Sequence, residues 1–278
     1  MNENNKTAKV REAVVSGIFY PEEVSELKAA ISAVFKEASK YRGDSRIILS
    51  PHAGFEYSGL ISAIAWISSA ECRPKTVAIL APYHRAEEPA VWLPESDIFQ
   101  SPLGPVRVDK EYIEELESCG TIFRVNDIPH LEEHDIEVQL PFMQTLFPDA
   151  SLVPILLGKP TPSAINSLAH ALSLAFSDKA DSILFVVSTN FSCFASVKES
   201  RERIDRTFKH VSIGDHASLY EEFKKDTPDM CGIGCLVSFM RSGLLEGANW
   251  NLLASSDSES KRSSLSEKVV FYAAGAWK

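Results

Sequence analysis

The clearest candidates for chemistry in this chain of 278 residues are two histidines that each follow a short apolar run. His52 comes just after the run 46–50, and His84 comes just after the run 76–81, each beyond a proline. Short apolar runs that end at turn residues are typical of buried strands, and open α/β sheets bind ligands beyond the carboxyl ends of their strands. Neutral imidazole is a common ligand for zinc, iron and copper. We therefore predict one shared site for both imidazoles; the alternative is that each histidine caps a strand or hydrogen-bonds a loop.

A cysteine is the third candidate. Cys231 stands just before the predicted helix 232–242. The positive potential at a helix N-terminus lowers the pKa of a thiol and favours the thiolate, which is the form that binds metals and attacks electrophiles. The alternative for Cys231 is a packed loop thiol. For Cys235, one helical turn later, we expect a small buried apolar residue.

A further histidine, His134, lies among the carboxylates of the segment 132–137. A carboxylate beside an imidazole raises the pKa of the imidazole and holds its tautomer, which suits a general base or a group that supports a metal ligand. The competing interpretation is a solvated helix start, with Asp135 near the cap.

Alternating strands and helices must position these groups. Helical periodicity predicts helices at 21–35, 60–69, 110–118, 133–147, 163–176, 199–210, 216–224 and 232–242. Apolar runs predict strands at 46–50, 76–81, 151–157 and 182–188, with late strands at 250–255 and 269–277. Pro141 either kinks or breaks its helix, and Pro154 suggests an edge strand or a bulge. The segment 85–108, rich in proline and polar residues, is expected to be an excursion from the core.

This alternation favours an α/β protein. We predict a three-layer α/β/α sandwich with a central mixed, mostly parallel sheet. The strand 182–188 then brings Asn190 and Cys193 to the same sheet edge as the two histidines. No long linker rich in Gly, Ser or Pro divides the chain, so we expect a single domain over residues 1–278.

Composition narrows the classes of function. The 28 basic and 38 acidic residues give a net charge of −10, which argues against nucleic acid as the main partner. No run approaches the ~18 apolar residues of a membrane span. Five scattered cysteines and a polar start suit a reducing cytoplasm, so we expect a cytoplasmic protein. The sequence has no P-loop, GxGxxG, HExxH or GxSxG pattern, so nucleotide binding and serine hydrolysis have no direct support.

Several segments, in order along the chain, resemble the signature of the Memo-like proteins. Residues 51–59, PHAGFEYSG, resemble the family's PHAGYxYSG, and residues 133–142, EHDIEVQLPF, resemble its EHSxEVQLPF. The opening 11–21, the pair Cys231-Gly232 and the closing 269–277 are similar to the family's AGxFYP, CG and last strand. The first two matches are specific, whereas the CG match alone is weak.

The resemblance implies a fold similar to that of the LigB-type, non-haem-iron extradiol dioxygenases. It implies His52, His84 and Cys231 as the metal ligands, and His134 would line the same cleft. Two imidazoles and a thiolate suit iron or copper, with zinc as a further option, and leave a position open for substrate or oxygen. Bacterial and archaeal members often accompany a radical SAM protein and an AMMECR-type protein, which makes both possible functional partners.

The chain also departs from the family pattern. Where the family usually reads GPNH, this chain reads APYH, ending at His84. Where the family usually reads SSDxxH, Asn190 replaces the aspartate and Cys193 replaces the histidine. The catalytic positions implied by the resemblance are therefore His134, Asn190 and Cys193. Asparagine cannot act as a carboxylate base, so this departure bears on proton transfer more than on metal binding. Cys193 is either a soft replacement ligand or the mark of a lost catalytic group.

Three interpretations follow. The first is a metal-binding, redox-active protein of dioxygenase-like architecture. The second is a non-catalytic binding or scaffold protein with a degraded active site, whose crevice binds a peptide or a partner protein. A small molecule is the other kind of ligand that we consider. Aromatic residues at the mouth of the crevice would then supply contact area: Phe55, Tyr57, Tyr83 and Phe191. The third, a hydrolase that uses Cys231 with His52 or His84 as base, lacks a clear orienting acid.

Overall fold

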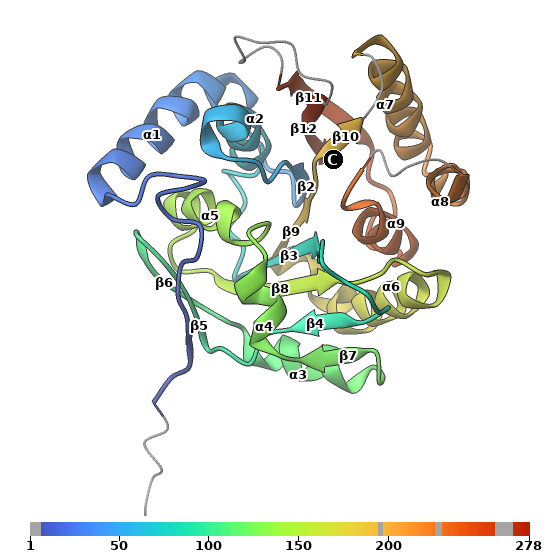
Figure 1. Cartoon of the computed structure of the whole chain (residues 1–278), viewed down its shortest axis with the longest axis horizontal. Helices are drawn as coiled ribbons and strands as arrows, with labels where there is room; N and C mark the ends of the chain where they lie inside the picture. Colours follow the sequence, from blue (N-terminus) through green and yellow to red (C-terminus); the bar gives the residue numbers. More distant parts are fainter. Residues whose placement is uncertain (1–6, 194–196, 226–229, 259–268) are drawn as a thin grey trace, which may run out of the picture.

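The computed structural model describes residues 7–193, 197–225, 230–258 and 269–278 (Figure 1). Within these ranges the strands are β1 (Val10–Arg11), β2 (Ile47–Ser50), β3 (Thr76–Pro82), β4 (Val91–Leu93), β5 (Ile98–Ser101), β6 (Gly104–Arg107), β7 (Phe123–Val125), β8 (Ser151–Leu157), β9 (Ile183–Ser188), β10 (Phe191–Cys193), β11 (Trp250–Asp257) and β12 (Val269–Trp277).

The α-helices of the described ranges are α1 (Val24–Glu37), α2 (Phe55–Ile67), α3 (Lys110–Ser118), α4 (Asp127–Glu132), α5 (Leu140–Leu146), α6 (Pro162–Phe176), α7 (Val197–Ser212), α8 (His216–Lys225) and α9 (Ile233–Arg241). Among them, no helix is both long enough and apolar enough to cross a membrane.

The main sheet is mixed, with a parallel centre. Its strand order is β10-β12-β2-β9-β3-β8-β4-β7, and β11 pairs with β12. The four adjacent strands β2, β9, β3 and β8 run parallel, whereas β12 and β4 flank them in antiparallel orientation. A smaller three-stranded sheet, β1-β5-β6, lies beside it. Because β2, β9 and β3 are neighbours with one direction, their carboxyl ends meet at one edge of the sheet.

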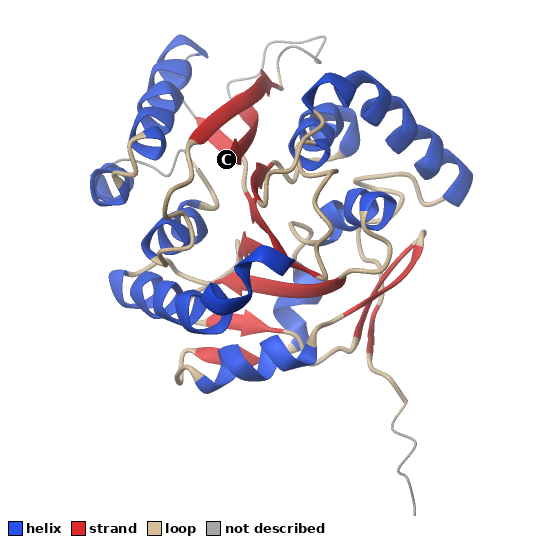
Figure 2. Ribbon diagram, turned by 180° about the vertical axis from the view of Figure 1, so that it is seen from behind, coloured by secondary structure: helices blue, strands red, loops and turns tan. Residues whose placement is uncertain are grey.

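Helices cover both faces of the main sheet, which confirms the three-layer α/β/α sandwich. Helices α1, α2 and α5 pack together on one side, where α2 contacts β2, β11 and β12. Helices α3, α6 and α9 form the opposite layer, and α9 contacts β3. Figure 2 shows the same layers from behind, with the sheet passing between the two groups of helices.

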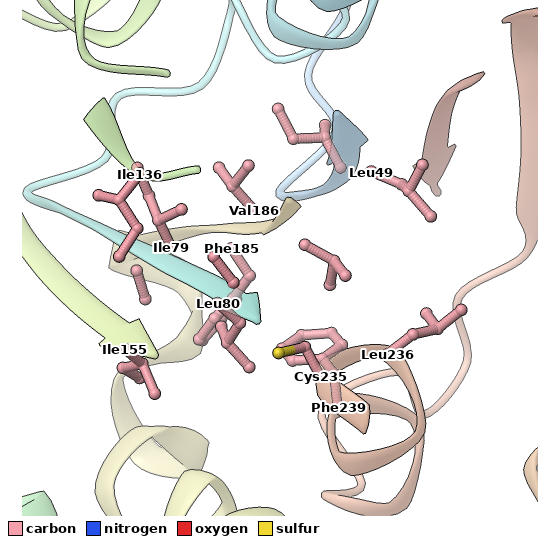
Figure 3. Close-up of a cluster of buried hydrophobic side chains, with 14 of the residues drawn as sticks. Leu49, Ile79, Leu80, Ile136, Ile155, Phe185, Val186, Cys235, Leu236 and Phe239 are labelled. Atoms are coloured by element: carbon pink, nitrogen blue, oxygen red, sulfur yellow. The ribbon is translucent and has the colours of Figure 1, made fainter. Parts of the chain in front are cut away.

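The core between the sheet and α9 is apolar throughout. Every residue of β3 and β9 is buried, as expected of parallel strands covered on both faces. Phe185 of β9 packs against Phe239 of α9, with ring centroids 5.1 Å apart. Cys235 lies on the same side of α9, facing the sheet (Figure 3), and is 1 % exposed. The expectation that Cys235 is a small buried apolar residue is confirmed.

Three sequence predictions about local structure were wrong. The segment 85–108 holds three short strands, β4 to β6, instead of an irregular excursion. The predicted helix 133–147 begins only at Leu140, with Pro141 in its first turn, where a missing backbone N–H costs nothing. Pro154 is neither at an edge nor in a bulge, because β8 lies between β3 and β4. On the side of β8 that faces away from β3, Leu152 pairs with Val108 and Leu156 pairs with Trp92 of β4. Pro154 lies between these two paired positions.

A buried ion pair ties the N-terminal segment to the loop that precedes α5. Arg11 and Glu137 are 1 % and 0 % exposed and form a short ion pair. Glu137 also accepts hydrogen bonds from the backbone N–H groups of Val14 (2.9 Å) and Val15 (3.0 Å) and from the Tyr20 hydroxyl (2.8 Å). One carboxylate therefore holds residues 11–20 against the sheet edge where the candidate site lies.

Candidate metal centre

The carboxyl ends of three adjacent strands bring the predicted residues together. His52 follows β2, Asn190 follows β9, and His84 follows β3. The ring centroids of His52 and His84 are 5.6 Å apart, with the rings nearly perpendicular. The Asn190 side-chain oxygen accepts the backbone N–H of His52 at 3.0 Å. Asn190 therefore contacts the site as a group that fixes the backbone of a candidate ligand.

Cys231 reaches the same point from the turn before α9. Its Sγ lies 3.2 Å from Nε2 of His52 and accepts the backbone N–H of Asn190 at 3.1 Å. The turn can approach β9 this closely because residue 232 is glycine. A Cβ at Gly232 would lie 2.7 Å from Cβ of Thr189, a distance that real Cβ atoms do not show.

His52, His84 and Cys231 could together bind one metal ion. One donor atom each from His52, His84 and Cys231 lies within 4.8 Å of the other two. Metal–nitrogen and metal–sulfur bonds of about 2.0–2.3 Å in tetrahedral geometry place such donors about 3.5 Å apart. The observed 3.2 Å between His52 Nε2 and Cys231 Sγ is close to that spacing.

The other ring nitrogen of each histidine is already engaged. Nδ1 of His52 lies 3.0 Å from the Ser188 hydroxyl and 3.5 Å from Asp135. Nδ1 of His84 lies 3.1 Å from Glu133 and 3.4 Å from Asp135. Partners on Nδ1 orient each ring and leave Nε2 to bind a metal ion, which would displace any proton held there, as in metal-bound histidines.

Charge in the site favours a thiolate. Burial opposes ionisation of Cys231, but His52 and His84 outweigh it and hold the thiol pKa well below its ordinary value. Burial likewise opposes a charged His84, yet contacts with Cys231, Glu133 and Asp135 raise its pKa to about 11. The deprotonated sulfur is the form that binds a metal ion.

Two acidic residues complete this environment. Asp135 is fully buried, and burial raises its pKa to about 7 although His52 and His84 oppose the rise. Burial also opposes ionisation of Glu133, but its contacts with His84 lower the pKa below the ordinary value. Asp135 is thus no solvated helix cap, and that interpretation of the segment 132–137 was wrong.

His134 lies beside the other two histidines, but its protonation state differs from the one expected. Its ring centroid is 5.6 Å from that of His52 and 4.4 Å from that of Phe19. Burial and the neighbouring His52 and His84 lower its pKa to about 3, outweighing the carboxylate of Glu133. The sequence-based expectation of a raised pKa was wrong, because folding buries His134 and brings two other imidazoles close to it.

The aromatic residues predicted at the mouth of the crevice differ in their burial. Phe191 is 1 % exposed and packs against Phe208, so it offers no contact area at a crevice mouth. Phe55 is half-buried and stacks on Phe142. Tyr57 is also half-buried, and the hydroxyl of the half-buried Tyr83 donates to Glu132.

Cys193 ends β10, and its backbone pairs with Val269. Its side chain lies outside the described part of the structure, so its two interpretations stay open.

Sequence reasoning missed the residues that hold the histidines in place. Gln139 donates to the Pro51 carbonyl at 2.9 Å and to the Ser188 hydroxyl at 3.1 Å. Ser188 in turn donates to the Asp135 carbonyl at 2.9 Å. The signal was a glutamate and a glutamine within an otherwise apolar stretch, EVQLPF.

The low pKa of the Cys231 thiol predicts how its alkylation depends on pH. In protein stripped of metal, alkylation of Cys231 by iodoacetamide should change little from about pH 6 to about pH 8, because the thiol is already ionised there. Cys119 is the internal control: burial raises its pKa, so its rate should rise about tenfold per pH unit. Mass spectrometry of the alkylated peptides measures both, and a tenfold rise per unit at Cys231 would contradict the lowered pKa.

Known proteins resemble this chain over most of its length. The sequence pattern of the family described as "Memo-like protein" matches residues 11–276. A MEMO1 family protein of Methanobrevibacter smithii is 29 % identical over 282 residues, covering 97 % of this chain and 100 % of the relative. A MEMO1 family protein of Ignicoccus hospitalis is 30 % identical over 277 residues, covering 95 % of this chain and 97 % of the relative. Among solved structures, an uncharacterized protein of Escherichia coli K12 is 11 % identical with a TM-score of 0.45, covering 81 % of this chain and 98 % of its own.

Proposed function

This chain belongs to the Memo-like protein family, and we propose that it binds one iron or copper ion through His52, His84 and Cys231. The centre would be redox-active and would serve a reaction on a small molecule in the adjoining cleft. The observation that carries this proposal is the convergence of a low-pKa thiol with two imidazoles whose Nδ1 atoms have other partners.

The donor set supports a redox metal. Soft thiolate with two imidazoles is typical of copper electron-transfer sites and is also compatible with iron. When bound, such a metal supplies the capacity to accept and release single electrons. With three protein donors, a further coordination position stays open, as in catalytic metal sites.

Residues around the donors support the proposal through orientation. Ser188 and Glu133 hold the two imidazoles, and Gln139 holds Ser188 and the carbonyl of Pro51. His134, which is 26 % exposed on its side chain, lies at the cleft in its neutral form. With a pKa of about 3, this imidazole stays neutral near pH 7 and can hydrogen-bond a bound molecule without adding charge.

Metal analysis tests the proposal. Wild-type protein purified without oxygen under metal-replete conditions should carry about one equivalent of iron or copper. His52→Ala and Cys231→Ala should each lose it, because each removes one of three donors. His216→Ala and Cys119→Ala are matched controls, a histidine and a thiol away from the donor set, and should retain the metal. Elemental analysis by mass spectrometry measures the metal content of the wild type and the four variants.

Wild-type protein free of metal would overturn the proposal and favour the second candidate, a binding protein without a reaction. Asn190 supports that candidate, because its amide is engaged with backbone and brings no carboxylate to the cleft. Retention of metal in both Ala variants would also contradict the proposal, since the ion would then sit elsewhere.

A further inference from the structure

The carboxylate of Asp135 is buried without a hydrogen-bond partner. Its side chain is 0 % exposed, and neither oxygen accepts a hydrogen bond from the described residues. Three imidazole nitrogens lie around it outside hydrogen-bonding geometry: Nε2 of His134 at 3.1 Å, Nδ1 of His84 at 3.4 Å and Nδ1 of His52 at 3.5 Å. A buried carboxylate is costly unless a hydrogen bond or a positive charge compensates it, so a cation beside Asp135 would be stabilised.

Glu133 and His84 present two further donors at the same place. Nδ1 of His84 lies 3.1 Å from a Glu133 oxygen and 3.4 Å from an Asp135 oxygen, and one donor atom of each residue lies within 4.8 Å of the other two. Ligand atoms bound to one ion at about 2.0–2.2 Å stand about 3–3.5 Å apart. The described residues therefore hold a second donor set, which shares only His84 with the set of His52 and Cys231.

We propose that Nδ1 of His84, Glu133 and Asp135 form a second cation site, which takes a hard divalent ion such as Mn²⁺. The inference goes beyond the proposed function, because this site uses neither the sulfur of Cys231 nor His52. Carboxylate oxygens suit Mn²⁺, whereas a thiolate favours softer ions such as copper and zinc. The two sites use the two nitrogens of one ring, with Nε2 of His84 left to the set that contains Cys231.

Charge and access both suit a cation at this place. Every ion-pair partner of Glu133 and Asp135 in the described part of the chain is a histidine, so no lysine or arginine already neutralises them. The Glu133 side chain is 4 % exposed, whereas that of His84 is 40 % exposed and lines a cavity of about 530 Å³. An ion can therefore reach the site along the His84 side and keep water in its open positions, as hard cations usually do.

Binding of Mn²⁺ to Cys231→Ala tests the inference. This variant lacks the thiolate, so Mn²⁺ added to the metal-stripped protein reports the second donor set. Electron paramagnetic resonance of free Mn²⁺ measures the bound fraction, and about one equivalent should bind. Asp135→Asn, added to Cys231→Ala, keeps the shape of the side chain but removes its charge, and it should weaken Mn²⁺ binding at least about tenfold.

Two further substitutions in the Cys231→Ala background make the result specific. Asp127→Asn is the same change at a carboxylate that contacts Ser96, and it should leave Mn²⁺ affinity within about twofold. His84→Ala removes the nitrogen donor at a partly exposed position, where the fold tolerates change better than at Asp135, and it should also weaken Mn²⁺ binding at least about tenfold.

Circular dichroism identifies any variant that fails to fold, and the folded ones decide the result. Absence of stoichiometric Mn²⁺ binding to Cys231→Ala would overturn the inference. Full Mn²⁺ affinity in a folded Asp135→Asn or His84→Ala protein would overturn it too, because the ion would then have other ligands.

The Mn²⁺ result is independent of the iron or copper content. If wild-type protein never carries iron or copper but Mn²⁺ binding depends on Asp135, only the proposed function is wrong. If iron or copper binds and is lost in Cys231→Ala as expected, but that variant takes up no Mn²⁺, only the second site is wrong.

Discussion

Replacing Arg11 with methionine should lower the free energy of unfolding by about 3–5 kcal/mol. Arg11 and Glu137 are almost fully buried, and removal of the guanidinium leaves a carboxylate in the interior without its counter-charge. Two carbonyls, of His130 and Glu133, also lose the donors that Arg11 supplies at 2.8 and 3.0 Å. The midpoint of urea denaturation, at unchanged slope, measures the loss.

An exposed ion pair gives the matched control. Lys179 lies 3.4 Å from Glu111 and from Glu115, with 44 % of its side chain exposed. Lys179→Met should cost less than about 1 kcal/mol, because water already screens that pair. A loss below about 1 kcal/mol in Arg11→Met would mean that Glu137 is satisfied by Val14, Val15 and Tyr20 alone.

The ion pair of Arg11 and Glu137 also supports the candidate metal centre. Glu137 holds the segment that contains Phe19, and Phe19 packs on His134. The Phe19 carbonyl accepts the backbone N–H of Phe55 at 2.7 Å, at the start of α2. The N-terminal segment is thus part of the wall of the site, although its sequence shows neither a strong strand nor a helix.

The central architecture could be predicted because its signals are local. The runs 46–50, 76–81 and 182–188 are mostly apolar, with polar residues only at their ends, and parallel strands buried on both faces require that pattern. Once these strands are assigned, the meeting of His52 and His84 at one sheet edge follows from topology. The short strands β4 and β7 were missed because three residues carry too little pattern to be recognised.

The environment of the histidines could not be predicted for a different reason. Asp135 resembles a helix cap in the sequence, since carboxylates are common at such positions. Its burial depends on imidazoles from β2 and β3 that surround it only in the folded chain. Burial of His134, together with its contacts with His52 and His84, reverses the pKa shift expected for that residue. The pKa values in this site depend on contacts between several loops, so no single segment of the sequence predicts them.

Glu133→Gln should weaken metal binding about 10–100-fold while leaving the three donor atoms in place. Glu133 accepts the backbone N–H of His84 and lies 3.1 Å from Nδ1 of the same residue. A glutamine oxygen can still accept the backbone N–H, but the amide lacks the negative charge that orients the ring and makes Nε2 a stronger donor. The fold should therefore persist while affinity falls.

The neighbouring residue supplies the control for this substitution. Glu132 is 36 % exposed on its side chain and contacts Tyr83 and Arg85. Glu132→Gln makes the same chemical change one position earlier and should leave affinity within about twofold of wild type. Competition with a chromophoric chelator for Zn²⁺, which has no redox chemistry of its own, measures all three proteins without interference from oxidation of Cys231. Equal affinities of Glu133→Gln and Glu132→Gln would show that the carboxylate does not support His84 as a ligand, and that the ring is held by Asp135 alone.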